Sequence, residues 1–351
     1  MATAFQRPQL APPAEPFHLS EGWQRCWADA YAEGAPVTVS VGDSWLRLQR
    51  HEQRLGPFRI PLLTSATNLQ TCYFDLEGGH ASQDALEALP SALLNTGAAQ
   101  VRIDWLAEDS PLLVAGQAWR RRHLAIAEPF AVSPLADCRG HFDDYLRLAG
   151  SSLRKYWKAC RRHILNGPIE FKIVTGGAGL GALLDEMFAL EASGWKGREG
   201  TAILCNASDA RFYGRLAWAA EAAGALRIAT LREEGRLLAY EYCVVGDGRV
   251  LAMKVGYDER RARLQPGHLV ALMNIRDACA DPAIGWYDML GNGMRVAEYK
   301  RRFATAYTTL WRVRLFARSP AGRLLYALYR AKPLAKRLGN RFRSFAHRRS
   351  A

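Results

Sequence analysis

The stretch Lys254-Val-Gly-Tyr-Asp-Glu-Arg-Arg-Ala-Arg-Leu-Gln-Pro-Gly267 decides the fold of this chain. Two apolar segments, 237–245 and 249–257, are separated by Gly-Asp-Gly, and this pattern predicts a β-hairpin. A basic loop follows, and then Pro266 and Gly267 begin an apolar pattern with helical spacing, where proline is favoured in the first turn. A helix start that follows a strand and a loop presents free backbone N–H groups and the positive end of the helix dipole. This arrangement suits a phosphate, which the loop arginines would also attract.

Residues on both sides extend the pattern. Gly285-Trp-Tyr-Asp-Met-Leu290 predicts a short strand, and it is followed by Gly291-Asn-Gly293 and the basic cluster Tyr299-Lys-Arg-Arg302. Upstream, Ser151-Ser-Leu-Arg154 opens a basic helix, and Glu191-Ala-Ser-Gly-Trp-Lys-Gly197 ends another. In this order, over roughly 143–303, the chain resembles the acyltransferase module of the GNAT superfamily, in the BioF-like or CelD-like branch related to the FemAB proteins. It departs from the superfamily's usual pyrophosphate loop, Gln/Arg-x-x-Gly-x-Gly/Ala, because the equivalent residues are Arg-Leu-Gln-Pro-Gly-His.

The resemblance implies an α/β (α+β) protein with the GNAT acyl-CoA N-acyltransferase fold, in tandem with a degenerate GNAT-like N-terminal lobe. The expected divisions are a flexible arm (1–17), the N-terminal lobe (18–127), a linker (128–140), the GNAT acetyltransferase domain (141–318) and a basic amphipathic tail (319–351). The linker is predicted from its two prolines and its lack of periodicity. No internal repeat is visible in the sequence.

Composition limits the class of protein. The chain has 351 residues, of which 49% are apolar, so it can bury cores for two ordinary domains. No segment approaches the roughly 18 to 20 uncharged apolar residues of a membrane span, and prolines stand where a signal peptide would have its apolar core, so a cytoplasmic protein is expected. The seven cysteines are scattered and lack metal-binding spacing, which predicts reduced thiols and no metal site.

The net charge of +13 is concentrated at one end of the chain. Residues 295–351 contain sixteen lysines and arginines and a single acidic residue, so this segment carries +15 and the remainder −2. Residues 322–345 also have leucines, tyrosines and phenylalanines at helical spacing opposite the basic side chains. This pattern predicts a helical element at the inner membrane surface. A tRNA partner is less favoured, since the aromatic residues share one face, and no DNA partner is expected.

Acyl transfer from a thioester needs an anchored pantetheine phosphate, a donor that polarises the thioester carbonyl, and a base for the acceptor's proton. By resemblance, acetyl-CoA or another acyl-CoA is the co-substrate. The residues expected to bind it are Lys254, Arg261, Arg263, Pro266, Gly267 and His268. A backbone N–H on the strand 249–255 is expected to polarise the carbonyl.

Two carboxylates compete for the role of base. Glu241 lies inside an apolar strand, an environment that raises a carboxyl pKa, but it could instead pair with Lys254 across the hairpin. Asp288 ends a strand that leads into a glycine-rich turn, where it could be a catalytic residue or a turn former. The residues expected to bind the acceptor are Trp195, Lys196, Tyr257, Tyr299, Lys300 and Arg301. Core packing for Trp195 and a solvated helix face for 299–301 are the alternatives.

These observations predict a CoA-dependent acyltransferase, of acetyltransferase type, that acts on an amine or hydroxyl of a sugar or amino-acid-derived acceptor. The resemblance links such proteins to cell-surface polysaccharide biosynthesis. Two alternatives stay open: an aminoacyl-tRNA-dependent transferase of FemAB type, and a catalytically silent adaptor at a membrane polysaccharide machine. The tail would hold a cytoplasmic protein at the periphery of the inner membrane.

Overall fold

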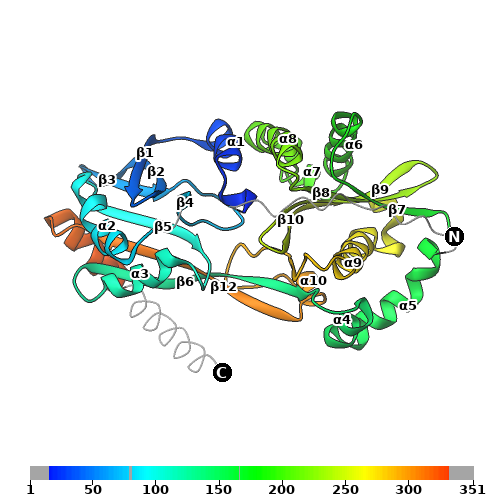
Figure 1. Cartoon of the computed structure of the whole chain (residues 1–351). Coiled ribbons are helices and arrows are strands. Elements are labelled where there is room, and N and C mark those ends of the chain that lie inside the picture. Colours follow the sequence, from blue (N-terminus) through cyan, green and yellow to red (C-terminus); the bar gives the residue numbers. More distant parts are fainter. Residues whose placement is uncertain (1–15, 79–80, 166, 332–351) are drawn as a thin grey trace, which may run out of the picture.

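The computed structural model describes residues 16–78, 81–165 and 167–331 (Figure 1). The first half contains η1 Phe17–Leu19, α1 Glu21–Tyr31, β1 Ala35–Val41, β2 Ser44–Leu55, β3 Phe58–Ser65, β4 Glu77–Gly78, α2 Gln83–Asn95, β5 Gln100–Leu106, α3 Pro111–Trp119 and β6 Leu124–Asp137. The second half contains α4 Phe142–Ala149, α5 Ser151–Leu165, β7 Ile169–Val174, α6 Leu180–Ser193, α7 Trp195–Arg198, η2 Ile203–Cys205, α8 Ala207–Ala222, β8 Leu226–Glu233, β9 Arg236–Gly246, β10 Arg249–Tyr257, η3 Glu259–Leu264, α9 Pro266–Cys279, β11 Trp286–Asp288, α10 Glu298–Arg301 and β12 Ala306–Phe316.

One mixed sheet runs through both halves, in the order β1-β2-β3-β5-β12-β6-β11-β10-β9-β8-β7, with β4 beside β2. Each half repeats the same succession: three antiparallel strands, a helix, a strand parallel to the third, a second helix and a long strand. The first half does so with β1-β2-β3, α2, β5, α3 and β6, and the second with β8-β9-β10, α9, β11, α10 and β12. The predicted α/β fold with a GNAT-like N-terminal lobe is therefore confirmed.

The two long final strands cross between the halves. β6, from the first half, pairs with β11 of the second, while β12, from the second half, pairs with β5 of the first. The two strands also pair antiparallel with each other from Ala306 opposite Leu135 to Phe316 opposite Leu124. Figure 1 shows them as the long central ribbons that join the two lobes. Each lobe therefore completes its sheet with a strand from the other.

This exchange corrects the predicted linker at 128–140. Most of the segment belongs to β6, in the middle of the sheet, and the prolines do not prevent pairing. Pro129 lies where the register with β12 shifts by one residue, and such irregularities are where a strand tolerates a residue without an N–H. Gly150 adopts φ of 99° between α4 and α5, so the basic helix that was predicted to open at Ser151 is a separate element from α4. By contrast, β9, β10 and α9 lie where the sequence pattern predicts them.

Residues 320–331 are helical and begin the predicted tail. Leu325 is buried against the N-terminal lobe, and the rings of Tyr326 and Tyr329 contact Phe316. Part of the apolar face predicted to meet a membrane is thus packed against the sheet, while Leu324 and Leu328 stay exposed. The rest of the tail, 332–351, and the arm up to residue 15 lie outside the described residues. Within the described ranges, the helices are all too short or too polar to cross a membrane.

Candidate active site

The site lies where β10 and β11 separate. The two strands pair in parallel only from Arg249 opposite Trp286 to Leu251 opposite Asp288, and β10 then continues to Tyr257 without β11 beside it. On its other edge, β10 has a bulge, because Ala252 lies opposite Cys243 and Lys254 lies opposite Tyr242. Met253 is therefore the extra residue, without a partner in the register with β9. An unpaired backbone group at a bulge is the kind of donor expected for a thioester carbonyl on this strand.

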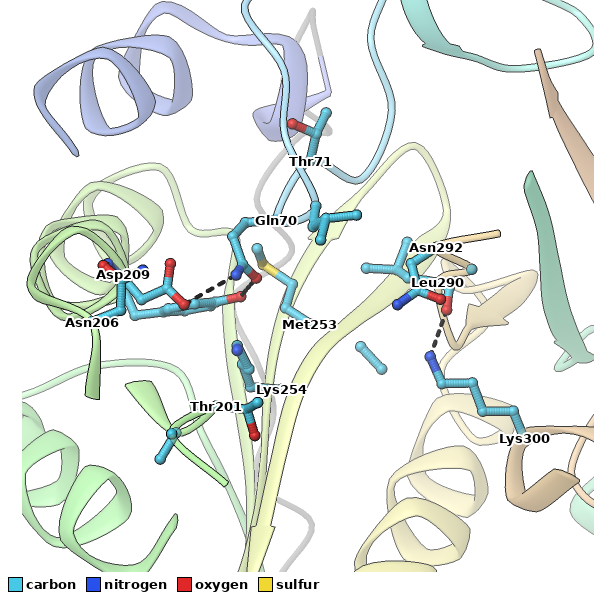
Figure 2. Close-up of a pocket in the computed structure, with 16 residues that line it drawn as sticks. Gln70, Thr71, Thr201, Asn206, Asp209, Met253, Lys254, Leu290, Asn292 and Lys300 are labelled. Carbon is cyan, nitrogen blue, oxygen red and sulfur yellow. Dashed lines mark hydrogen bonds between the residues drawn. The ribbon is translucent and has the colours of Figure 1, made fainter. Parts of the chain in front are cut away.

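Three cavities meet at this opening. The α9 cavity, of about 120 Å³, lies between β10, the start of α9 and α10, and its lining includes Glu241, Gly267 and His268. The lobe cavity, of about 480 Å³, lies between the N-terminal lobe and α8, and its lining includes Gln70 and Asp209 (Figure 2). The β6 cavity, of about 300 Å³, lies between β6 and residues 290–301. Lys300 lines all three cavities, and residues 252–254 line both the α9 cavity and the lobe cavity. The bulge in β10 therefore lies between these two cavities, which are two parts of one candidate site.

Glu241 lies opposite Val255, on the face of the sheet that α9 covers. Its Oε2 accepts hydrogen bonds from Asn274 Nδ2 at 3.0 Å and from the Tyr287 hydroxyl at 2.5 Å. Its Oε1 accepts none from the part of the chain that the structure describes, and the side chain lines the α9 cavity. Burial raises the pKa of this carboxyl, although the two hydrogen bonds act in the opposite direction. The predicted pair with Lys254 does not form, because Lys254 lies on the other face.

Asp288 has a different environment, because both its oxygens are occupied. Oδ1 accepts hydrogen bonds from Ser133 Oγ at 2.5 Å and from the backbone N–H of Leu290 at 2.8 Å. Oδ2 accepts one from the hydroxyl of Tyr73, a residue of the N-terminal lobe. The residue is fully buried and does not line any of the three cavities. Asp288 therefore joins the two lobes and shapes the turn that follows it.

The start of α9 offers one free backbone donor. Gln265 adopts a left-handed conformation, and its carbonyl accepts hydrogen bonds from His268 N at 2.9 Å and Leu269 N at 3.0 Å. The N–H of Gly267 makes no hydrogen bond to any described residue. A Cβ at Gly267 would lie 2.8 Å from a ring carbon of Tyr257, so the glycine allows close packing as well as access to the backbone. Pro266, predicted at the first helical position, is found there.

The arginines of the preceding loop differ in their partners. Arg260 pairs with Asp258, and Arg261 pairs with Glu233. Arg263 is exposed and has no ion pair with any described residue. It lines a cavity of about 360 Å³ beside the α9 start, together with His163. Among the three, Arg263 is thus the cation whose charge is least compensated.

Two residues predicted to bind the acceptor are held by the protein itself. Lys196 donates from Nζ to Glu191 Oε1 and to the carbonyl of Val255, both at 2.6 Å. Trp195 is 39% exposed, and its backbone N–H donates to Glu259 Oε1 at 2.7 Å. Both residues thereby fix α7 against β10 and the basic loop.

The α10 residues close the α9 cavity. The ring of Tyr299 stacks on that of His268, with centroids 6.4 Å apart and an interplanar angle of 14°. Lys300 donates from Nζ to the carbonyls of Met289 at 2.7 Å and Leu290 at 2.6 Å, and burial lowers its pKa to about 8. Burial also lowers the pKa of His268, which favours a neutral imidazole. Arg301 is exposed and lines the β6 cavity.

Sequence patterns gave no signal for the far wall of the lobe cavity. The carboxylate of Asp209, on α8, accepts hydrogen bonds from the Tyr31 hydroxyl at 2.6 Å and from Gln70 Nε2 at 3.1 Å. The amide oxygen of Gln70 accepts one from the Tyr213 hydroxyl at 2.7 Å. Figure 2 shows Gln70 reaching from the N-terminal lobe toward these α8 residues. The residues in these contacts are 139 to 178 positions apart in the sequence, so only the folded chain brings them together. No group of residues suited to a metal ion is found in the described ranges.

Comparisons with known proteins agree with this geometry. Residues 151–301 match the family model described as an acetyltransferase (GNAT) domain. The solved structure of FemX is 9% identical, with a TM-score of 0.59 over 87% of this chain and 93% of that one. A conserved protein of unknown function from Bacteroides thetaiotaomicron is 10% identical, with a TM-score of 0.57 over 87% of this chain and 93% of that one. At such identities the likeness shows a shared fold, and it extends over both lobes. No curated protein matches the chain.

Proposed function

We propose that this chain is an acyltransferase that moves an acyl group from acyl-CoA to an amine or hydroxyl of a small acceptor, because residues 151–301 match the family model described as an acetyltransferase (GNAT) domain. One observation carries the proposal: the bulge at Met253 lies in the part of β10 whose opposite edge is no longer paired with β11, with the α9 cavity on one face and the lobe cavity on the other. A donor from the α9 side and an acceptor from the lobe side would meet at this edge. A sugar or amino-acid-derived acceptor, used in cell-surface polysaccharide biosynthesis, remains part of the proposal.

The residues at the α9 start fit a phosphate. The free N–H of Gly267 and the helix dipole would hold it, and Arg263 would add a compensating charge nearby. When bound, acyl-CoA supplies the activated acyl group. The α9 cavity of about 120 Å³ is smaller than the roughly 300–1,000 Å³ of usual ligand sites, so Tyr299 or Lys300 must move to admit the donor.

Glu241 is the proposed base. Its Oε1 faces the α9 cavity without a hydrogen bond, while Oε2 is held by Asn274 and Tyr287, so the carboxylate is positioned and can still accept a proton. The pKa raised by burial brings this carboxyl closer to the working pH, where a general base is most effective. The unpaired backbone of Met253 would donate to the carbonyl oxygen as negative charge develops on it.

Thermal unfolding of the purified chain with acetyl-CoA, longer acyl-CoAs and free CoA tests the donor. A ligand at about 100 times its dissociation constant stabilises the native state by roughly 2.7 kcal/mol. We expect a clear rise in melting temperature that is reduced in Arg263→Gln and retained in Arg260→Gln, since Arg260 is already paired. No rise with any CoA ester in cooperatively folded protein would refute a CoA donor.

An aminoacyl-tRNA donor is a second candidate, supported by the surface of α5. This helix has no acidic residue, and its exposed basic side chains are Arg154, Lys155, Lys158, Arg161 and Arg162. It packs beside the α9 start, because the Tyr156 hydroxyl donates to the carbonyls of Leu264 and Gln265, both at 3.1 Å. Salt-dependent binding of tRNA without any response to CoA would favour this donor. A chain that responds to neither would fit the silent adaptor.

Contact with the inner membrane surface is also part of the proposal. The basic charge of residues 295–351 and the exposed Leu324 and Leu328 support it. Sedimentation of the full chain with anionic vesicles, but not with neutral ones, is the expected result. Sedimentation with neither vesicle type, or equal sedimentation with both types, would argue against an electrostatic contact.

A further inference from the structure

Lys254 differs from the other lysines at the site. The ammonium groups of Lys196 and Lys300 each donate to two oxygen atoms at 2.6–2.7 Å. Lys254 is half-buried, yet it makes no hydrogen bond or ion pair with any described residue, and its nearest described interaction is with the ring of Tyr213, 5.3 Å from the centroid. A partly desolvated ammonium without an oxygen partner is costly, so Lys254 is suited to bind an anionic ligand.

The position of Lys254 assigns that ligand to the lobe cavity. Because of the bulge, Lys254 lies opposite Tyr242, whose hydroxyl donates to the Tyr213 carbonyl on α8 at 3.0 Å. The side chain is thus on the α8 face, whereas Glu241 and the α9 start are on the other. In Figure 2 Lys254 lies next to Thr201 and faces the same space as Gln70. Lys254, predicted from sequence to bind the cofactor, thus has its side chain on the face of the sheet that is proposed for the acceptor.

The charges that line the lobe cavity do not balance. Asp209 is its one carboxylate among the described residues, and Tyr31 and Gln70 already donate to it. Lys300 supplies a second ammonium, bonded only to neutral carbonyls. Two cations thus face one carboxylate, which leaves the cavity with an excess of one positive charge.

The remaining polar lining is neutral. It consists of hydroxyl and amide side chains from both lobes: Gln70, Thr71, Thr201, Asn206 and Asn292. Such groups recognise hydroxyls and amides, and a cavity of about 480 Å³ has the size of a small-molecule site. We propose that the acceptor is an anion with several hydroxyl or amide groups, and that its carboxylate or phosphate binds to Lys254. This inference rests on the proposed function, because it names the class of acceptor for the same site.

Binding of matched pairs tests the inference without any donor present. Titration calorimetry would compare glucosamine with glucosamine 6-phosphate, and serinamide with serine. For the wild-type chain we expect the member that carries the phosphate or carboxylate, in at least one pair, to bind at least tenfold more tightly than the member without it, a factor equivalent to about 1.4 kcal/mol. Lys254→Gln should remove this preference, and Lys254→Arg should keep most of it. Lys172→Gln, on the exposed side of β7, is the control and should bind as the wild type does.

The outcomes separate this inference from the proposed function. The inference would be overturned by equal binding within both pairs, or by no binding of either glucosamine 6-phosphate or serine. It would also be overturned if a folded Lys254→Gln variant kept the preference for the compound with the anionic group. Thermal unfolding with acetyl-CoA is measured on the same variants. Loss of the CoA response in Lys254→Gln with the anion preference unchanged would place Lys254 at the donor and also overturn the inference. A Lys254-dependent preference without any CoA response would instead refute the CoA donor and leave the anion site standing.

Discussion

Replacement of Glu241 by glutamine separates catalysis from stability. Both hydrogen bonds to this carboxylate, from Asn274 and Tyr287, end on Oε2, and Oε1 faces the α9 cavity without a hydrogen bond. A glutamine oxygen in the place of Oε2 can accept both bonds, and the amide nitrogen would then face the cavity. The substitution therefore removes the proton acceptor while every described hydrogen bond of the side chain is kept.

The expected kinetic effect follows from the role of a base. General base catalysis contributes about 10²- to 10⁴-fold to rate, or about 2.7 to 5.5 kcal/mol of the barrier, and Glu241→Gln should lose a factor in this range. The assay measures thiol release from acyl-CoA, with an acceptor or with water as the acyl acceptor. The wild-type rate should fall as the pH drops through the raised pKa of Glu241, because only the carboxylate accepts a proton. The residual rate of the variant should not show this fall.

The free energy of unfolding should depend on pH in the direction opposite to that of the reaction rate. Burial raises the pKa of Glu241 above its ordinary value of 4.5, so between the two values the native state binds this proton more tightly than the unfolded state does. The contribution of Glu241 to the free energy of unfolding therefore decreases as pH rises through this window, and the variant should lack the decrease. At neutral pH, Glu241→Gln should be as stable as the wild type or more stable in urea. An activity within threefold of the wild type, or a loss of activity explained by unfolding, would refute the assignment of Glu241 as base.

Three further predictions concern the rest of the site. Asp288→Asn should lower the free energy of urea unfolding by about 1–3 kcal/mol, since both carboxylate oxygens accept hydrogen bonds; a stable variant that has lost activity would point to a catalytic role instead. Tyr299→Ala should enlarge the α9 cavity and tighten CoA binding at least threefold in calorimetry, whereas Tyr307→Ala should not; weaker binding in the first variant would show that the ring contacts the donor. Residues 141–318 alone should not fold, because they lack β6 between β11 and β12; cooperative unfolding of that fragment would contradict the strand exchange.

The helices and strands that the sequence predicted correctly depend on local residue patterns. The hairpin of β9 and β10 and the proline at the start of α9 depend on residues close together in the chain, so alternation and turn composition identify them. The same patterns missed the central position of β6. A strand that exchanges between lobes takes its partners from 150 to 190 residues away, and its prolines resemble those of a linker.

The choice between Glu241 and Asp288 shows the same limit. Both are acidic residues at strand positions within one short segment, and sequence left either as the base. They differ in how many carboxylate oxygens accept no hydrogen bond from the described residues: one in Glu241 and none in Asp288. This difference depends on partners such as Tyr73, which is 215 residues from Asp288. The wall of the lobe cavity formed by Gln70 and Asp209 was likewise invisible, because neither residue belongs to a recognisable motif.

The repeated architecture of the lobes allows the opening beside β10 to be compared with its equivalent in the N-terminal lobe. In the N-terminal lobe β3 and β5 also separate after three residue pairs, but the following segment fills the space, with Phe74 N donating to the carbonyl of the buried Trp105 at 2.9 Å. The helix equivalent to α9 is α2, whose first turn carries Asp84 and is capped by Ser82, so it repels an anion where α9 would attract one. The same filling segment carries Gln70 into the lobe cavity and Tyr73 to Asp288. Under the proposed function, this one segment would both fill the space equivalent to the donor site and supply part of the acceptor wall, so the chemistry of the second lobe would depend on the first.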